Sequence, residues 1–262
     1  MKSFNKLTSH ANRLVHRAWA NMGIPFDVEE IDEKREGIID VEALLVATLL
    51  IMEQDRMVTD LPAWIIRFTD LINHQKLKGM WMSLPQKYRK RVMEKLDVTG
   101  FSATPRAFKN AFRVWKFRET KGQKPFESRI RKLNSIEHVA QSSVMMKNRL
   151  LYGTGFRADL VTVTQVENLK VSAREMSKIL SAADSTISRL LNDLRACGFL
   201  NQHNERKDGG DTFPRVFISS YSVWNLIELL DAHEFQSKEL KSAAVVGLDL
   251  RFDGFCRRLL DS

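Results

Sequence analysis

Residues 171–200 read VSAREMSKILSAADSTISRLLNDLRACGFL, and this stretch predicts two short helices joined by a tight turn. Ser172 and Glu175 have the spacing of a capping box, in which a hydroxyl and a carboxylate each satisfy a free backbone N–H group. A helix is therefore expected to begin at Ala173, and its apolar residues keep one face through Leu180.

The second helix is expected to follow residues 181–184, with Asp184 as its cap. Ile187, Leu190, Leu191 and Leu194 have the spacing of one buried helix face. An anionic Asp184 beside a phosphate-binding face would be repulsive unless capping turns it inward. The predicted outer side of this helix is short, polar and rich in hydrogen-bonding groups, with Ser185, Arg189 and Asn192 at its centre and Ser188 and Arg195 on its flank.

A β hairpin is expected after the second helix. Gly198 suits a left-handed helix stop, Phe199 to Gln202 suit a strand, Gly209-Gly210 suit a turn, and residues 213–219 suit a return strand. The predicted fold is therefore mainly α, with an N-terminal helical domain and a C-terminal winged helix-turn-helix that carries a small β hairpin.

The pattern in residues 172–200 resembles bacterial winged-helix transcription regulators of the arsenic-repressor and multiple-antibiotic-repressor type. The resemblance covers about the last two-fifths of the chain. It implies that the helix 185–197 enters the DNA major groove and that a wing carrying Arg206 and Lys207 touches the DNA backbone.

A further likeness involves residues 40–64, with Asp55-Arg56-Met57, and residues 148–158, which read NRLLYGTGFRA. These stretches are similar to two-part bacterial regulators often encoded beside nucleotidyltransferase-like toxins.

The residue types on the predicted reading face fit base recognition. An arginine such as Arg189 pairs with guanine acceptors in the major groove, and an asparagine such as Asn192 pairs with adenine. Ser185, Thr186 and Ser188 are hydroxyl donors for phosphates at the helix start, although Thr186 equally suits a partly buried position. The alternative for Arg189 is an ordinary salt bridge with Asp193 or Glu175. Glu205, Asp208 and Asp211 nearly cancel the charge of Arg206 and Lys207.

The net charge of +9 is concentrated in one segment. Residues 86–135 hold 15 Lys and Arg against 4 Asp and Glu, whereas the rest of the chain is nearly balanced. Arg113 and Lys116 alternate there with aromatic residues, a composition that attracts phosphates and makes binding depend on salt. A solvated basic helix face over core aromatics is the alternative interpretation.

Four parts are expected along the chain: an N-terminal helix and acidic arm in residues 1–36, a helical domain with the basic segment in 37–124, a linking helix and the winged helix-turn-helix in 125–235, and an extension in 236–262. The first part is expected to contain a basic helix at 5–21. Apolar spacing from residue 38 to 96 predicts a bundle of amphipathic helices. One helix is expected between the linker at 121–125 and Leu151. Another, at 222–235, is expected to place Trp224, Ile227 and Leu230 on one face.

Composition limits the class of protein. A chain of 262 residues with 44% hydrophobic residues suits a folded protein of two domains. Cys197 and Cys256 are too few for a disulfide framework, which favours the cytoplasm. The most apolar run, residues 41–52, is too short to span a membrane.

Catalytic patterns are weak. Gly153, Gly155 and Ala158 formally match a dinucleotide fingerprint, but the preceding residues suit a helix where that site needs a strand. The six histidines lack metal-ligand spacing, and neither a phosphate-loop lysine nor a nucleophile elbow is present. We therefore expect no enzyme activity, no cofactor and no metal.

The sequence predicts a sequence-specific regulator of transcription that binds double-stranded DNA as a repressor. A homodimer is expected, because one recognition helix reads only a few base pairs. In the alternative, the winged helix is a protein-interaction module or an antitoxin-like partner of a toxin.

Overall fold

The computed structural model describes residues 2–25, 38–51, 57–90, 92, 127–167, 172–200 and 216–234, and these are mainly helical. The elements are α1 (Lys2–Asn21), β1 (Ile38–Ile39), α2 (Val41–Ile51), α3 (Met57–Arg67), the 3-10 helix η1 (Thr69–Leu71), α4 (His74–Ser83), α7 (Glu127–Ile130), α8 (Ile136–Ser142), α9 (Val144–Tyr152), α10 (Phe156–Glu167), α11 (Ala173–Leu180), α12 (Asp184–Ala196), β2 (Val216–Ile218) and α13 (Ser220–Glu234).

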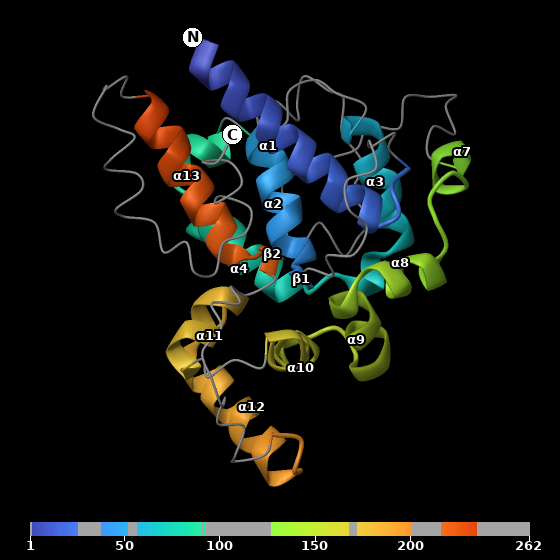
Figure 1. Ribbon diagram of the computed structural model, residues 1–262, viewed down its shortest axis with the longest axis vertical. Coiled ribbons are helices and arrows are strands. Elements are labelled where there is room, and N and C mark those ends of the chain that lie inside the picture. Colours follow the sequence, from blue (N-terminus) through green and yellow to red (C-terminus); the bar gives the residue numbers. More distant parts are fainter. Residues whose placement is uncertain are drawn as a thin grey trace.

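The larger of two hydrophobic cores surrounds α2, which contacts α1, α4 and α13 (Figure 1). Every residue of α2 is buried. The expectation of an amphipathic helix is therefore wrong for α2, because neighbouring helices enclose it and leave no face for water. A helix that is apolar on nearly all sides suits this position.

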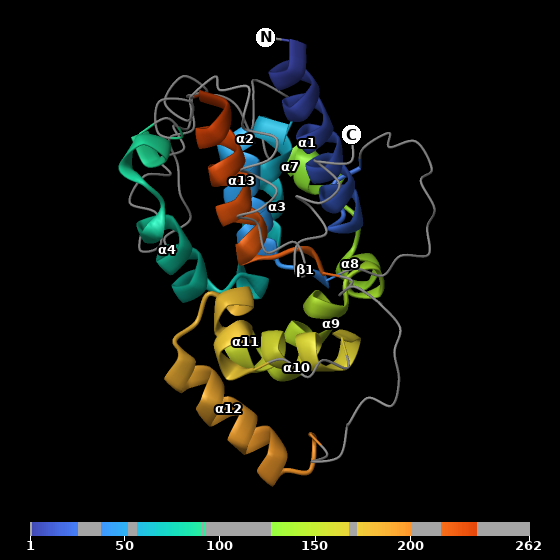
Figure 2. The same cartoon turned by 60° about the vertical axis from the view of Figure 1, so that its left-hand side comes forward.

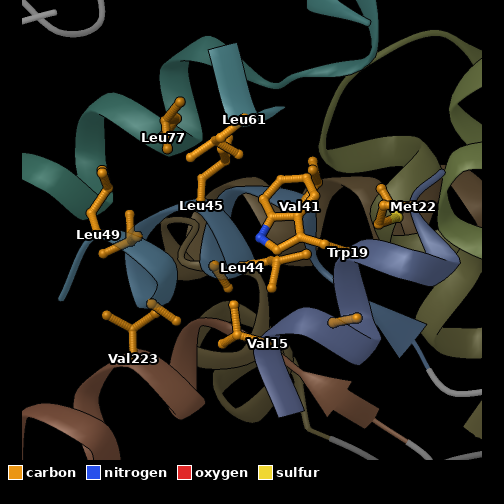
Figure 3. Close-up of a cluster of buried hydrophobic side chains, with 14 of the residues drawn as sticks. Val15, Trp19, Met22, Val41, Leu44, Leu45, Leu49, Leu61, Leu77 and Val223 are labelled. Atoms are coloured by element: carbon orange, nitrogen blue, oxygen red, sulfur yellow. The ribbon is translucent and has the colours of Figure 1, made fainter. Parts of the chain in front are cut away.

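The N-terminal helix α1 belongs to this core, whereas the expected acidic arm that follows it lies outside the described residues. Trp19 and Trp64 meet edge to face with ring centroids 5.1 Å apart, and Figure 3 shows Trp19 among the aliphatic side chains around α2. Both indole N–H groups have buried acceptors: Trp19 donates to Oγ1 of Thr48 at 2.8 Å, and Trp64 donates to the carbonyl of Met22 at 2.5 Å. These partners offset the cost of burying polar groups.

The smaller core joins α10, α11 and α12. It contains the apolar residues predicted for the two short helices, together with Leu160, Val161 and Val163 of α10 and Ile38 of β1. Phe156 is the first residue of α10 and packs against this core. Figure 2 shows α10 and α11 between α12 and the helices around α2.

The expected wing hairpin is not present among the residues that the structure describes. Phe199 and Leu200 lie outside any strand, and residues 201–215 lie outside the described ranges. The expected return strand does form, as β2, but it pairs in parallel with β1, with Ile38 opposite Val216 and Ile39 opposite Ile218. β1 therefore bonds to backbone groups of β2 that a hairpin partner would otherwise bond to.

Two helix predictions need correction. Residues 127–152 form α7, α8 and α9 rather than one helix, because the hydroxyls of Ser135 and Ser143 cap α8 and α9. On α13, Trp224 is 37% exposed, and the buried face consists of Val223, Leu226, Ile227 and Leu230. α13 packs in the larger core, so that the chain returns there after α12.

Candidate nucleic-acid interface and a buried charge cluster

The predicted capping box is confirmed at the start of α11. The N–H of Glu175 donates to Oγ of Ser172 at 3.2 Å, and the N–H of Ser172 donates to Oε2 of Glu175 at 2.9 Å. These two bonds therefore satisfy backbone N–H groups at the start of α11, and no residue distant in the sequence is needed.

The turn between α11 and α12 is tight. Ser181 ends α11 in the left-handed conformation, with φ of 53°, and the N–H of Ala182 donates to the carbonyl of Ser177 at 2.9 Å. The capping role predicted for Asp184 is wrong, because Ala183 is the N-cap of α12 and makes no side-chain cap. Asp184 instead accepts a hydrogen bond from the hydroxyl of Ser177. That bond turns the carboxylate toward α11, so one of its oxygens is engaged within the protein.

The two faces of α12 are as predicted. Ile187, Leu190, Leu191 and Leu194 are buried. Six residues were predicted to contact DNA from this helix, and all but one are exposed: Ser185, Ser188, Arg189, Asn192 and Arg195 are exposed, and Thr186 is half-buried. Both views place α12 at the end of the molecule opposite the start of α1 (Figure 1, Figure 2).

The two alternative partners expected for Arg189, Asp193 and Glu175, are bonded to other residues. Asp193 forms an ion pair with Arg157 at 3.2 Å, and Glu175 closes the capping box. Among the described residues, none pairs with the guanidinium of Arg189. Its planar set of donors therefore faces outward from α12.

Asn192 already uses its acceptor within α12. Its Oδ1 accepts a hydrogen bond of 3.0 Å from Nη1 of Arg195. An amide oxygen has two lone pairs, so this bond leaves one acceptor position on Oδ1 and both N–H donors of Asn192.

The end of α12 also follows the prediction. Gly198 has φ of 71°, a left-handed value that glycine adopts without strain. The N–H of Phe199 donates to the carbonyl of Leu194 at 2.9 Å. The remaining predicted contacts, Arg113, Lys116, Arg206 and Lys207, lie outside the described residues.

A second feature, which the sequence interpretation missed, is a buried charge cluster of five residues: Asp40, Glu42, Lys76, Arg149 and Asp159. All five have side chains that are at most 2% exposed. They come from four helix ends that meet where the two cores adjoin.

Arg149 is the centre of this cluster. Its guanidinium donates to Glu42 through two bonds of 2.7 Å, and to Asp159 through bonds of 2.7 and 2.8 Å. A further bond of 2.8 Å goes to the carbonyl of Leu71. Bidentate pairs of this kind bind a carboxylate strongly and in one orientation.

Lys76 is the second cation of the cluster. Its Nζ is 2.5 Å from Oδ2 of Asp40 and 3.2 Å from Oδ2 of Asp159. Oδ1 of Asp40 accepts from the N–H of Ala43 at 3.2 Å, but its Oδ2 accepts no hydrogen bond of ordinary geometry from a described residue.

Burial and neighbouring charges change the protonation of these groups. Burial raises the pKa of Asp40 to about 6, although the charge of Lys76 opposes this effect. Burial also acts to raise the pKa of Asp159, but Arg149 and Lys76 outweigh it and lower that pKa. For Lys76, burial acts to lower the pKa, but the surrounding carboxylates raise it above its ordinary value. Asp40 is therefore the group of the cluster that changes charge in mildly acidic solution.

The sequence held a partial signal for this cluster. Asp40 and Glu42 directly precede the apolar run of α2, and Arg149 lies among apolar residues of α9. All three belong to the stretches that carry the weaker family resemblance. Which charges would pair could not be read from spacing, because the partners are far apart in sequence.

The described residues hold no group of three or more His, Cys, Asp or Glu side chains placed to bind a metal ion. Within the same ranges, each helix is too short or too polar to cross a membrane. No protein-family model, curated protein or solved structure matches this chain.

Proposed function

We propose that this protein is a sequence-specific, DNA-binding regulator of transcription that reads bases in the major groove with α12 and acts as a repressor. The observation that carries the proposal is the outer face of α12. It is polar, it includes an arginine without a described partner, and it lies at one end of the molecule.

The local geometry favours this function over a purely structural role for α12. The outer side chains of α12 are held at defined positions, because α11 is capped, the turn is tight and the opposite face of α12 is buried. Arg189 and Asn192 are one turn apart on that side, a spacing that suits neighbouring base pairs. Arg174 and Lys178 of α11 are also exposed and suit contacts with the DNA backbone.

The DNA contact would extend to basic residues outside the described ranges and to a second copy of the chain. Arg206 and Lys207 would contact phosphates from a wing, and Arg113 and Lys116 would add a basic surface. The protein would bind as a homodimer, because two reading helices related by a twofold axis cover a longer site. Its expected location is the cytoplasm.

The decisive experiment selects binding sites from a randomised duplex library that also contains DNA from upstream of the gene. Fluorescence anisotropy then gives Kd for the enriched duplex and for its shuffled version, at two salt concentrations. Arg189→Ala is expected to weaken binding to the enriched duplex by about 10- to 100-fold, in line with the removal of one bidentate pairing with a base. Binding to the shuffled duplex is expected to change much less.

The matched control is Arg174→Ala, which removes the same charge from an exposed position on α11. It is expected to affect the two duplexes equally, because a backbone contact carries no sequence information. Equal losses on both duplexes for Arg189→Ala would exclude base reading by this residue. A selection that enriches no sequence would overturn the proposal.

A protein-interaction module is the second candidate, favoured by one observation. Leu150, Leu151 and Tyr152 at the end of α9 are 44%, 66% and 48% exposed. Adjacent exposed apolar side chains are typical of protein-binding surfaces. Failure to bind any duplex would favour this candidate, with an antitoxin-like role toward a toxin as one form of it.

A further inference from the structure

The buried charge cluster lies where the two hydrophobic cores adjoin. Asp40, Glu42 and Lys76 belong to the segment of the larger core, around α2 and α4. Asp159 belongs to α10, whose apolar residues lie in the smaller core with α11 and α12. Arg149 bonds to both sides through Glu42 and Asp159. The cluster therefore connects the helices around α2 to α10, which packs against the helix-turn-helix.

The charges in the cluster do not balance. Three carboxylates face two cations, and all five side chains are buried. When every group is ionised, one negative charge remains in a site that excludes water, and this is costly. One bound proton removes the excess. Asp40 is the acceptor that fits, because both oxygens of Asp159 and Glu42 are bonded to Arg149, whereas the cation in contact with Asp40 is Lys76, which it shares with Asp159.

The groups that face Asp40 come from each element that meets there. They are Lys76 of α4, Glu42 of α2, Asp159 of α10 and Arg149 of α9. Glu42 and Asp159 oppose its ionisation, and Lys76 and Arg149 favour it. Ionised Asp40 is thus repelled by a carboxylate on each side of the boundary, including Asp159 on the helix that carries the smaller core.

α10 connects the buried charge cluster to α12. Asp159 bonds to Arg149 inside the cluster, and Arg157, two residues earlier, pairs with Asp193 of α12 at 3.2 Å. α10 also contacts both α11 and α12. α10 thus contacts both the cluster and α12, so a shift of α10 on the cluster would be passed to α12.

We propose that the buried charge cluster is a proton-operated joint, in which proton uptake by Asp40 favours the docked position of the helix-turn-helix and thereby presents α12 to DNA. Loss of the proton restores the excess negative charge and favours a second, less tightly docked position. Only the last step, DNA binding, rests on the function proposed above.

The joint itself is tested without DNA, by the distance between two spin labels measured with double electron–electron resonance. One label is on the native Cys197, which is exposed at the end of α12. The other is on Gln86→Cys, an exposed position two residues before Tyr88 of the larger core, and Cys256 is replaced by serine. The full chain is measured from pH 5 to pH 8.

We expect one narrow distance at pH 5 and a second population that grows with a midpoint near pH 6. The pKa of Asp40 is about 6 when docked and 3.8 in water, so the ratio of the two positions can change by up to about a hundredfold. Asp40→Asn is expected to keep the single distance at every pH. Asp40→Ser, which retains a capping oxygen for Ala43, is the second neutral variant.

The matched control is Asp60→Asn, a buried aspartate of α3 outside the cluster, which should leave the pH response intact. A distance that stays constant in the wild-type chain from pH 5 to pH 8 would overturn the joint whatever the variants do. A response that persists in the neutral Asp40 variants would also overturn it, because histidines titrate in the same range.

Anisotropy on the enriched duplex separates this inference from the proposed function. We expect wild-type Kd to be at least threefold lower at pH 5 than at pH 8, and Asp40→Asn to lack that difference. A changing distance without DNA binding at any pH would support the joint and reject the regulator. DNA binding with a constant distance would do the reverse.

Discussion

Arg149 and Glu42 are 107 positions apart in the sequence, yet Nη1 and Nη2 of Arg149 each lie 2.7 Å from an oxygen of Glu42. This pair connects the start of α2, in the larger core, to the end of α9. The same guanidinium bonds to Asp159 of α10. α10, which packs against α11 and α12, is therefore held by buried charges to the helices around α2.

Arg149→Met is expected to lower the free energy of unfolding by about 3–5 kcal/mol, because it leaves buried carboxylates without their main cation. Arg149→Lys should be milder, since lysine keeps the charge but loses the planar set of donors. Urea denaturation followed by circular dichroism measures both. Arg157→Met is the control at an exposed ion pair and should cost less than about 1 kcal/mol. Similar losses for the Arg149→Met and Arg157→Met variants would show that the cluster adds no special stability.

The stability of the wild-type chain relative to Asp40→Asn is expected to depend on pH. The pKa of Asp40 in the folded protein, about 6, is above its ordinary value of 3.8. The folded state therefore binds more protons than the unfolded state between these values, and this contribution to stability is full below pH 3.8 and lost as the pH rises through about 6. The difference between the two chains should change by roughly 1–3 kcal/mol over this window. Denaturation series at pH 4, 5, 6 and 7 provide the measurement, and parallel curves would contradict the raised pKa.

Leu45→Ala is expected to destabilise the protein by about 2–5 kcal/mol, because Leu45 is fully buried in α2 and its truncation leaves a cavity. Leu151→Ala removes the same atoms from a residue that is 66% exposed and should change stability by less than about 0.5 kcal/mol. Thermal unfolding of both variants tests this contrast. A large loss for Leu151→Ala would mean that a partner or an undescribed segment covers the end of α9.

Combined Arg113→Ala and Lys116→Ala changes are expected to weaken binding to specific and shuffled duplexes alike. For every phosphate that these side chains neutralise in the wild-type complex, the slope of log K against log salt should become shallower by about 0.9 in the variant. Anisotropy titrations at four salt concentrations give these slopes. An unchanged slope would place both residues away from the DNA backbone.

Local signals were sufficient for α11 and α12. The capping box, the apolar spacing and Gly198 act within a few residues of one another, so the sequence predicted both helices and the outer face of α12. The predicted cap of α12 was wrong, because the carboxylate of Asp184 accepts a hydrogen bond from the hydroxyl of Ser177, seven positions earlier. That competition depends on how α11 and α12 pack, and composition does not show it.

Two other predictions were wrong or incomplete because they depended on a neighbouring element far away in the sequence. Trp224 was expected on the buried face of α13, but α2 covers a neighbouring side of this helix, where Val223 and Leu226 lie. The strand β2 was predicted, but its partner was not, because β1 lies about 180 positions earlier in the sequence. Helical spacing and strand propensity identify an element but not its neighbour.

The sequence by itself determined the helix-turn-helix, its exposed polar face and the concentration of basic charge, because these features depend on periodicity, on caps and on residue counts. Only the tertiary structure decided that α2 is enclosed on all sides, that β2 pairs with β1, and that five charges meet between the cores. Ion pairs and strand pairing join groups far apart in the chain, and their energies depend on distances and burial that exist only after folding.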